Sequence, residues 1–168
     1  MEYIAPVYKS AAEAKNFPVA AINSFHWEKD GYSRPESYAA LFAVEGDKRY
    51  INFEVNPKGV YLSQIGENRE NRRFIKEFTN LEPVIMPMEI EENGKKAWGY
   101  EIIIPEAFIS DLYDTDYKIH ECEIKGNFYK CADSSATPHY GAHFPVTTAA
   151  LGFHNPECFG KIIIRKAD

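Results

Sequence analysis

Short alternating runs separated by turn residues constrain the fold of this chain more than any other feature. In KRYINFEV (48–55), the apolar residues Ile51, Phe53 and Val55 alternate with polar neighbours. A period of two places these side chains on one face of a strand and leaves a polar face opposite. The run SYAALFAV (37–44) precedes it, and Glu-Gly-Asp at 45–47 predicts a hairpin turn between the two strands.

Further strands are predicted wherever similar runs lie between Gly, Pro and Asn signals. The segment 67–78 is polar and could form a helical turn or two, or a long polar excursion. The residues after Pro105 predict one short helix over 106–113. The additional strands are expected at 60–65, 82–92, 97–105, 118–131 and 161–166, with the two prolines of 82–92 suiting an edge strand.

The 168 residues contain no internal repeat and no linker, so we expect a single domain over 1–168. A hydrophobic content of 45% with 26% charged residues is typical of a globular protein. Many short strands and one small helix predict an all-β fold, an antiparallel β-sandwich of immunoglobulin-like or jelly-roll-like type.

The charge distribution argues against nucleic acid as a partner. The net charge is −6, and the densest cationic group, Arg69, Arg72 and Arg73, is interleaved with Glu67 and Glu70. Phosphate binding needs clustered cations that this chain does not offer. No segment approaches the roughly 20 apolar residues of a membrane span, so we expect no membrane partner. Oligomeric state is left open.

The three cysteines, Cys122, Cys131 and Cys158, are widely spaced and form no CxxC pattern. This argues against a disulfide framework and against a structural zinc site, and predicts that the cysteines are free thiols. Charged residues near the start interrupt any signal-like apolar run. Thiols and the missing signal slightly favour a cytoplasmic location, but the sequence does not fix the compartment.

Signatures of common enzyme classes are missing, because the chain has no GxSxG, P-loop, HExxH or GxGxxG pattern. One enzymatic alternative remains, a metal-dependent hydrolase or lyase that uses Asp133, His139, His143 and His154. The carboxylates of DLYDTD (111–116) could instead hold calcium, although an acidic surface loop explains them more simply. We otherwise expect no cofactor.

Residues 126–145, GNFYKCADSSATPHYGAHFP, combine four aromatic rings with two histidines and little aliphatic content. Together with GFHNPECFGKIII (152–164), this stretch resembles the C-terminal signature of carbohydrate-binding family 9-like proteins, which are similar to the family 9 modules of some xylanases. RYINFEVNPKGVYLSQIGENRENR (49–72) and AWGYEIIIP (97–105) resemble further family segments. The resemblance covers roughly residues 17 to 165.

This resemblance implies a β-sandwich that binds a mono- or oligosaccharide, or a glycan end, without catalysis. Aromatic rings would cover the apolar face of a sugar ring, while polar side chains would bond its hydroxyl groups. Where the family usually has a tryptophan after its His-Tyr pair, this chain has His143. A sandwich that has lost sugar binding and serves as an interaction module is the other alternative. The expected ligand-binding residues are Trp27, Glu54, Arg72, Asn127, Tyr129, His139, Tyr140 and His143.

Overall fold

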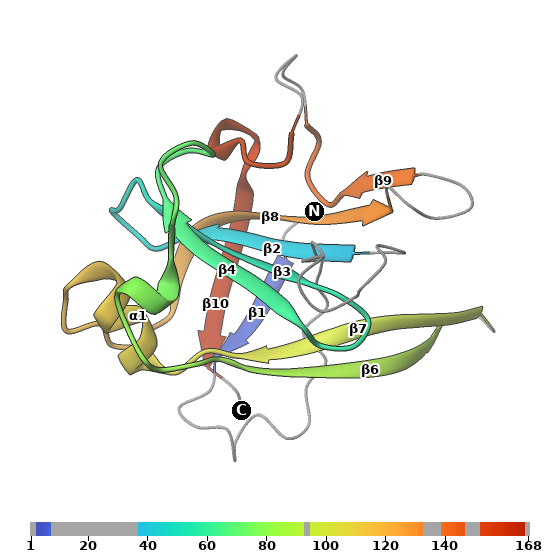
Figure 1. The fold of residues 1–168 in the computed structure, drawn as a ribbon, viewed down its shortest axis with the longest axis horizontal. Helices are drawn as coiled ribbons and strands as arrows, with labels where there is room; N and C mark the ends of the chain where they lie inside the picture. Colours follow the sequence, from blue (N-terminus) through green and yellow to red (C-terminus); the bar gives the residue numbers. More distant parts are fainter. Residues whose placement is uncertain (1–2, 8–36, 93–94, 133–138, 147–151, 167–168) are drawn as a thin grey trace.

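The computed structural model describes residues 3–7, 37–92, 95–132, 139–146 and 152–166 of the chain. Most of its strands form one eight-stranded sheet with the order β1-β10-β8-β2-β3-β4-β5, and β9 pairs with β8 (Figure 1). The strands of this sheet are β1 (Tyr3–Val7), β2 (Ser37–Ala43), β3 (Tyr50–Val55), β4 (Tyr61–Gly66), β5 (Arg73–Phe74), β8 (Cys122–Ala132), β9 (His139–Ala142) and β10 (Gly160–Lys166).

A hairpin of β6 (Val84–Glu92) and β7 (Lys95–Ile103) forms a second, two-stranded sheet. The helix α1 (Glu106–Tyr113) follows it, and both lie on the same side of the large sheet in Figure 1. The strand pairs are antiparallel except for β1 with β10, which are parallel. The architecture confirms the all-β sandwich with one short helix.

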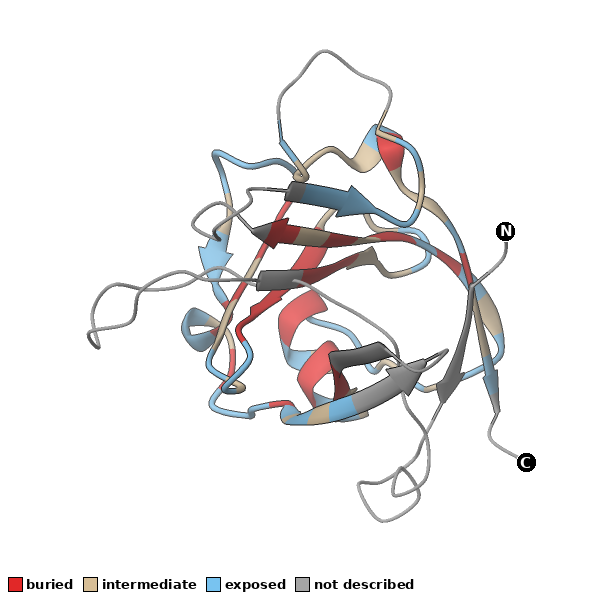
Figure 2. Cartoon of the chain, turned by 90° about the vertical axis from the view of Figure 1, so that its right-hand side faces the viewer, coloured by how far each residue is buried: buried red, intermediate tan, exposed pale blue. Residues whose placement is uncertain are grey.

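The main core lies between the large sheet and the layer formed by α1 and the β6–β7 hairpin. Ile51, Phe53 and Val55 of β3 point into it, as their period of two predicts, and are fully buried. The rings of Phe53 and Phe108 stack with centroids 6.1 Å apart, which joins the sheet to α1. Figure 2 shows the buried residues concentrated on α1 and the central strands.

Local sequence signals place several turns and the helix correctly. At the β2–β3 hairpin, the Asp47 amide donates to the Val44 carbonyl at 3.2 Å, and Gly46 adopts a φ of 82° that suits glycine. The helix α1 spans 106–113 as predicted, with Pro105 immediately before its first turn. The cysteines Cys122, Cys131 and Cys158 are not joined in disulfides.

Residues 67–78 combine the two alternatives that the sequence left open: a polar excursion at 67–72 leads into β5, and a 3₁₀ turn follows at Ile75–Glu77. Asn68 and Asn71 hold that excursion, because their side-chain oxygens accept bonds from nearby backbone amides. The polar face of β3 is buried as well, and the side chains of Arg72 and His154 contact it from two loops. The described residues include no helix that is long and apolar enough to cross a membrane.

Candidate functional site

A row of polar side chains lies on the face of the large sheet that looks away from α1. Tyr50, Asn52 and Glu54 alternate along β3, so they share this face, and their exposed fractions are only 0%, 0% and 2%. Glu54 pairs across the ladder with Ala39 of β2, which is small and leaves room above the sheet. Buried polar groups need partners, so this row requires a polar cover.

The Glu54 carboxylate is the centre of a buried network. Its Oε1 accepts a hydrogen bond from Asn52 Nδ2 at 2.7 Å. The same oxygen lies 3.4 Å from Arg72 Nη1 and 3.3 Å from His154 Nε2. The Arg72 and His154 side chains retain 12% and 10% of their surface, against 3% for Glu54. The network is therefore closed at its base and reaches solvent through Arg72 and His154.

His154 connects this network to Tyr50. The Tyr50 hydroxyl lies 3.2 Å from His154 Nδ1, although the two residues are 104 positions apart. Nε2 of the same ring lies 3.3 Å from the Glu54 carboxylate, which can only accept, so a neutral ring with its proton on Nε2 accepts the Tyr50 proton at Nδ1. Burial, opposed in part by Arg72, raises the pKa of Tyr50 to about 12. Tyr50 therefore remains a hydrogen-bond donor at ordinary pH.

Two loops carry the groups that cover this face. Arg72 ends the 67–72 excursion, and Gly66 allows its approach: a Cβ at Gly66 would lie 2.8 Å from the Arg72 Cα. His154 belongs to the segment 152–159, where Asn155 caps a 3₁₀ turn. A Cβ placed on Gly152 would lie 3.6 Å from Arg69 Nη1, so the two loops are neighbours.

The aromatic rings beside the network differ in exposure. Tyr129 is 2% exposed, and Phe153 stacks on it with a centroid separation of 4.3 Å. Tyr140 is 61% exposed and meets the edge of Phe153, with centroids 6.4 Å apart. The expectation of an open ring therefore holds for Tyr140 and not for Tyr129, because Phe153 covers the Tyr129 face.

Asn127 has a structural role in this conformation. It is completely buried, and its Nδ2 donates to the carbonyls of Phe144 and Cys158 at 3.1 Å each. Its Oδ1 accepts from the Phe144 amide at 3.0 Å and from the Phe128 amide at 2.8 Å. No donor or acceptor of this amide is turned to solvent. Asn127 fastens the C-terminal loops to β8. Its amide group is occupied by these bonds, so it does not offer a contact for a ligand.

Of the two histidines in 126–145, the structure describes the side chain of His143 and only the backbone of His139. The His143 side chain is exposed and packs edge-on against Phe128 and Phe144. His139 lies in β9, and its backbone pairs with Ala132. Trp27 and Asp133 lie outside the described residues. Of the four residues in the metal-dependent alternative, the structure therefore describes the side chains of His143 and His154 only. Both ring nitrogens of His154 already face Tyr50 and Glu54.

The sequence indicated some of the residues of this network and not others. The spacing Tyr-x-Asn-x-Glu at 50–54 placed three polar groups on one face, and Glu54 and Arg72 were both expected to bind ligand. Tyr50 and Asn52 were expected only to lie on a polar face, and their part in the network was not predicted. His154 was assigned to a metal alternative, and no local pattern could have shown that it packs above β3.

The fold and the site together define a β-sandwich whose large sheet carries a buried polar network and, on β9, an exposed aromatic ring. Residues 20–164 match the sequence profile of carbohydrate-binding family 9, and the chain belongs to this family. A search of curated proteins gives no match. Among solved structures, the chain is similar to a candidate carbohydrate-binding protein from Bacteroides uniformis ATCC 8492. The identity is 26% and the TM-score 0.55, and the match covers 76% of this chain but 60% of that one.

Proposed function

We propose that this protein binds a carbohydrate without catalysis, through the face that carries Glu54, Arg72 and His154 beside Tyr140. Family membership supports sugar binding in general. The observation that carries the location is the buried Glu54 carboxylate, which holds Arg72 and His154 at the protein surface. The ligand we propose is a mono- or disaccharide, or the end of a glycan.

The chemistry of the proposed face matches a sugar ring. The exposed ring of Tyr140 can cover the apolar C–H face of a pyranose. Arg72 Nε donates to the Arg69 carbonyl and Nη1 to Glu54, and the second amino group, Nη2, is the donor we propose for a sugar hydroxyl oxygen. The Glu54 contact fixes the Arg72 head group, so less side-chain entropy is lost on binding. Asn52 Oδ1 is buried without a hydrogen-bond partner in the protein, so the network holds one acceptor that is not used.

Isothermal titration calorimetry against a panel of mono- and oligosaccharides tests this proposal. A millimolar dissociation constant corresponds to only about 4 kcal/mol, so sugars must be present at high concentration. For a sugar that binds, Tyr140→Ala should weaken affinity about 5–10-fold, because the stacking surface is lost. Tyr140→Phe is the matched control, which keeps the ring and should retain most of the affinity.

Arg72 provides an independent variant. Arg72→Lys keeps the charge but loses the planar guanidinium group, and should also weaken binding. The rest of the protein surface should stay the same in this variant. If no sugar releases heat or raises the melting temperature, the protein is an interaction module and the proposal fails. If sugar binds equally well in Tyr140→Ala and Arg72→Lys, binding occurs on another surface.

A further inference from the structure

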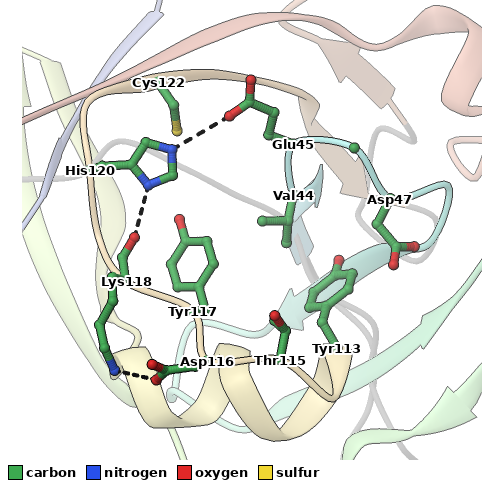
Figure 3. Close-up of a pocket in the computed structure, with 11 residues that line it drawn as sticks. Val44, Glu45, Asp47, Tyr113, Thr115, Asp116, Tyr117, Lys118, His120 and Cys122 are labelled. Atoms are coloured by element: carbon green, nitrogen blue, oxygen red, sulfur yellow. Dashed lines mark hydrogen bonds and ion pairs between the residues drawn. The ribbon is translucent and has the colours of Figure 1, made fainter.

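A second polar region lies beside the β2–β3 hairpin, in a part of the structure that the sugar site does not use. It is a hollow of about 500 Å³ between the hairpin turn and the segment that runs from the end of α1 to the start of β8. Figure 3 shows Tyr113 and Tyr117 on its walls and the side chains of Glu45, His120 and Cys122 together at one end.

These three side chains form a compact set of metal-ligating groups. One donor atom from each of Glu45, His120 and Cys122 lies within 4.8 Å of the other two. His120 Nε2 is 3.5 Å from Glu45 Oε2. Two ligands of one tetrahedral zinc ion, with bonds of about 2.0–2.3 Å, are separated by about 3.3–3.6 Å. The histidine and the carboxylate already have this separation, and only the thiol must move closer.

The sheet topology brings the three residues together from distant parts of the chain. β2 pairs antiparallel with β8, and Ala43 lies opposite Lys125. Continuing this register past Ala43 puts Glu45 level with Glu123, the residue next to Cys122 at the start of β8. His120 lies two residues before Cys122, at the bend that leads into β8, and its side chain lies beside that of Cys122.

The orientation of His120 is fixed by a contact behind its ring. His120 Nδ1 lies 2.8 Å from the Lys118 carbonyl, which can only accept, so Nδ1 carries a proton. Nε2 then directs its lone pair towards the Glu45 carboxylate, which is also an acceptor. Two facing acceptors need a proton or a cation between them. A backbone carbonyl behind the ring is the usual second-shell arrangement of a metal-ligating histidine.

We propose that Glu45, His120 and Cys122 bind a divalent transition-metal ion of the zinc type, with the fourth coordination position open to the hollow. Imidazole, thiolate and carboxylate ligands together select zinc-like ions over calcium or magnesium, which prefer oxygen ligands alone. Three protein ligands with one open position are typical of an accessible metal site, whereas closed structural sites use four. The absence of a CxxC pattern does not count against this site, because its ligands come from two separate segments.

Titration of the metal-stripped full chain with Co²⁺ and Zn²⁺ tests the proposal. Co²⁺ bound to Cys122 should produce a thiolate-to-metal charge-transfer band in the near ultraviolet, and one equivalent of Zn²⁺ should compete it away. Cys122→Ser should abolish the band. His120→Gln and Glu45→Gln should each weaken affinity about 100-fold, since even the outer-shell partners of metal ligands cost 10–100-fold when removed.

Asp116→Asn is the matched control. Asp116 lines the same hollow and pairs with Lys118, but it is not one of the three ligands. Its loss should change affinity no more than about 3-fold, because exposed charges are screened. An equal loss in Asp116→Asn and Glu45→Gln would show diffuse attraction and overturn the proposal. So would stoichiometric binding unaffected by Cys122→Ser, or no cobalt band. Glu45 and His120 are exposed, and thermal melts will confirm that the variants fold.

Discussion

Replacing Glu54 with glutamine probes the buried network at its centre. The substitution keeps the shape of the side chain but removes the charge that faces Arg72 and His154 at 3.4 and 3.3 Å. It also replaces one carboxylate oxygen with an NH2 group, which can only donate a hydrogen bond. Truncating a buried ion pair costs about 3–5 kcal/mol, and a hydrogen bond to a charged group contributes about 1.5–3 kcal/mol.

Because Arg72 retains 12% of its side-chain surface, solvent compensates part of this loss. We therefore expect Glu54→Gln to lower the free energy of unfolding by about 2 kcal/mol. For a domain of this size, that corresponds to a fall in melting temperature of about 4–8 °C. Urea unfolding followed by tryptophan fluorescence and calorimetric melting measure the two quantities independently.

Glu123→Gln is the matched control for this measurement. Glu123 pairs with Lys161 between β8 and β10, and the two side chains are 54% and 45% exposed. An exposed pair contributes about 1 kcal/mol at most, so this variant should differ little from the wild type. Equal stability losses in the two variants, or no loss in Glu54→Gln, would refute the argument that the Glu54 network stabilises the fold because it is buried.

Three further predictions follow from the same face of the sheet. Gly66→Ala should destabilise the protein by about 1–3 kcal/mol in urea unfolding, because the new methyl group would overlap Arg72; an unchanged midpoint would contradict this. Phe153→Ala should lower the unfolding free energy by about 2 kcal/mol, since it uncovers the Tyr129 ring, whereas Phe153→Leu should recover part of the loss. The free energy of unfolding should fall as the pH rises from 10 towards 12, because the unfolded chain releases the Tyr50 proton near pH 10 and the folded protein near pH 12. Urea unfolding at several pH values measures this decline, which should be shallower in Tyr50→Phe.

Much of the fold was predictable from local patterns. Alternation in 48–55 defined β3 and its two faces, and Gly46 marked the hairpin that leads into it. The helix after Pro105 was predicted with its correct limits. These features depend on backbone preferences and side-chain periodicity within a few residues, which the sequence displays directly.

The candidate site was predictable only in part. Glu54, Arg72 and Tyr140 were all expected from the sequence as ligand-binding residues, and the structure buries Glu54 beneath Arg72 and leaves Tyr140 exposed. Tyr129 and Asn127 were expected there too, but Phe153 covers the first, and the second fastens loops to β8. A ring or an amide in a strand has the same local appearance whether it is covered or open.

The sequence by itself determined which side chains share a face, because a strand has a period of two that no distant contact can change. Only the tertiary structure decided what covers each face. His154 reaches Tyr50 across 104 positions, and Glu45 meets Cys122 because β2 and β8 are neighbours. Such contacts depend on how separate segments pack together, and that packing is set by the whole core rather than by any local pattern.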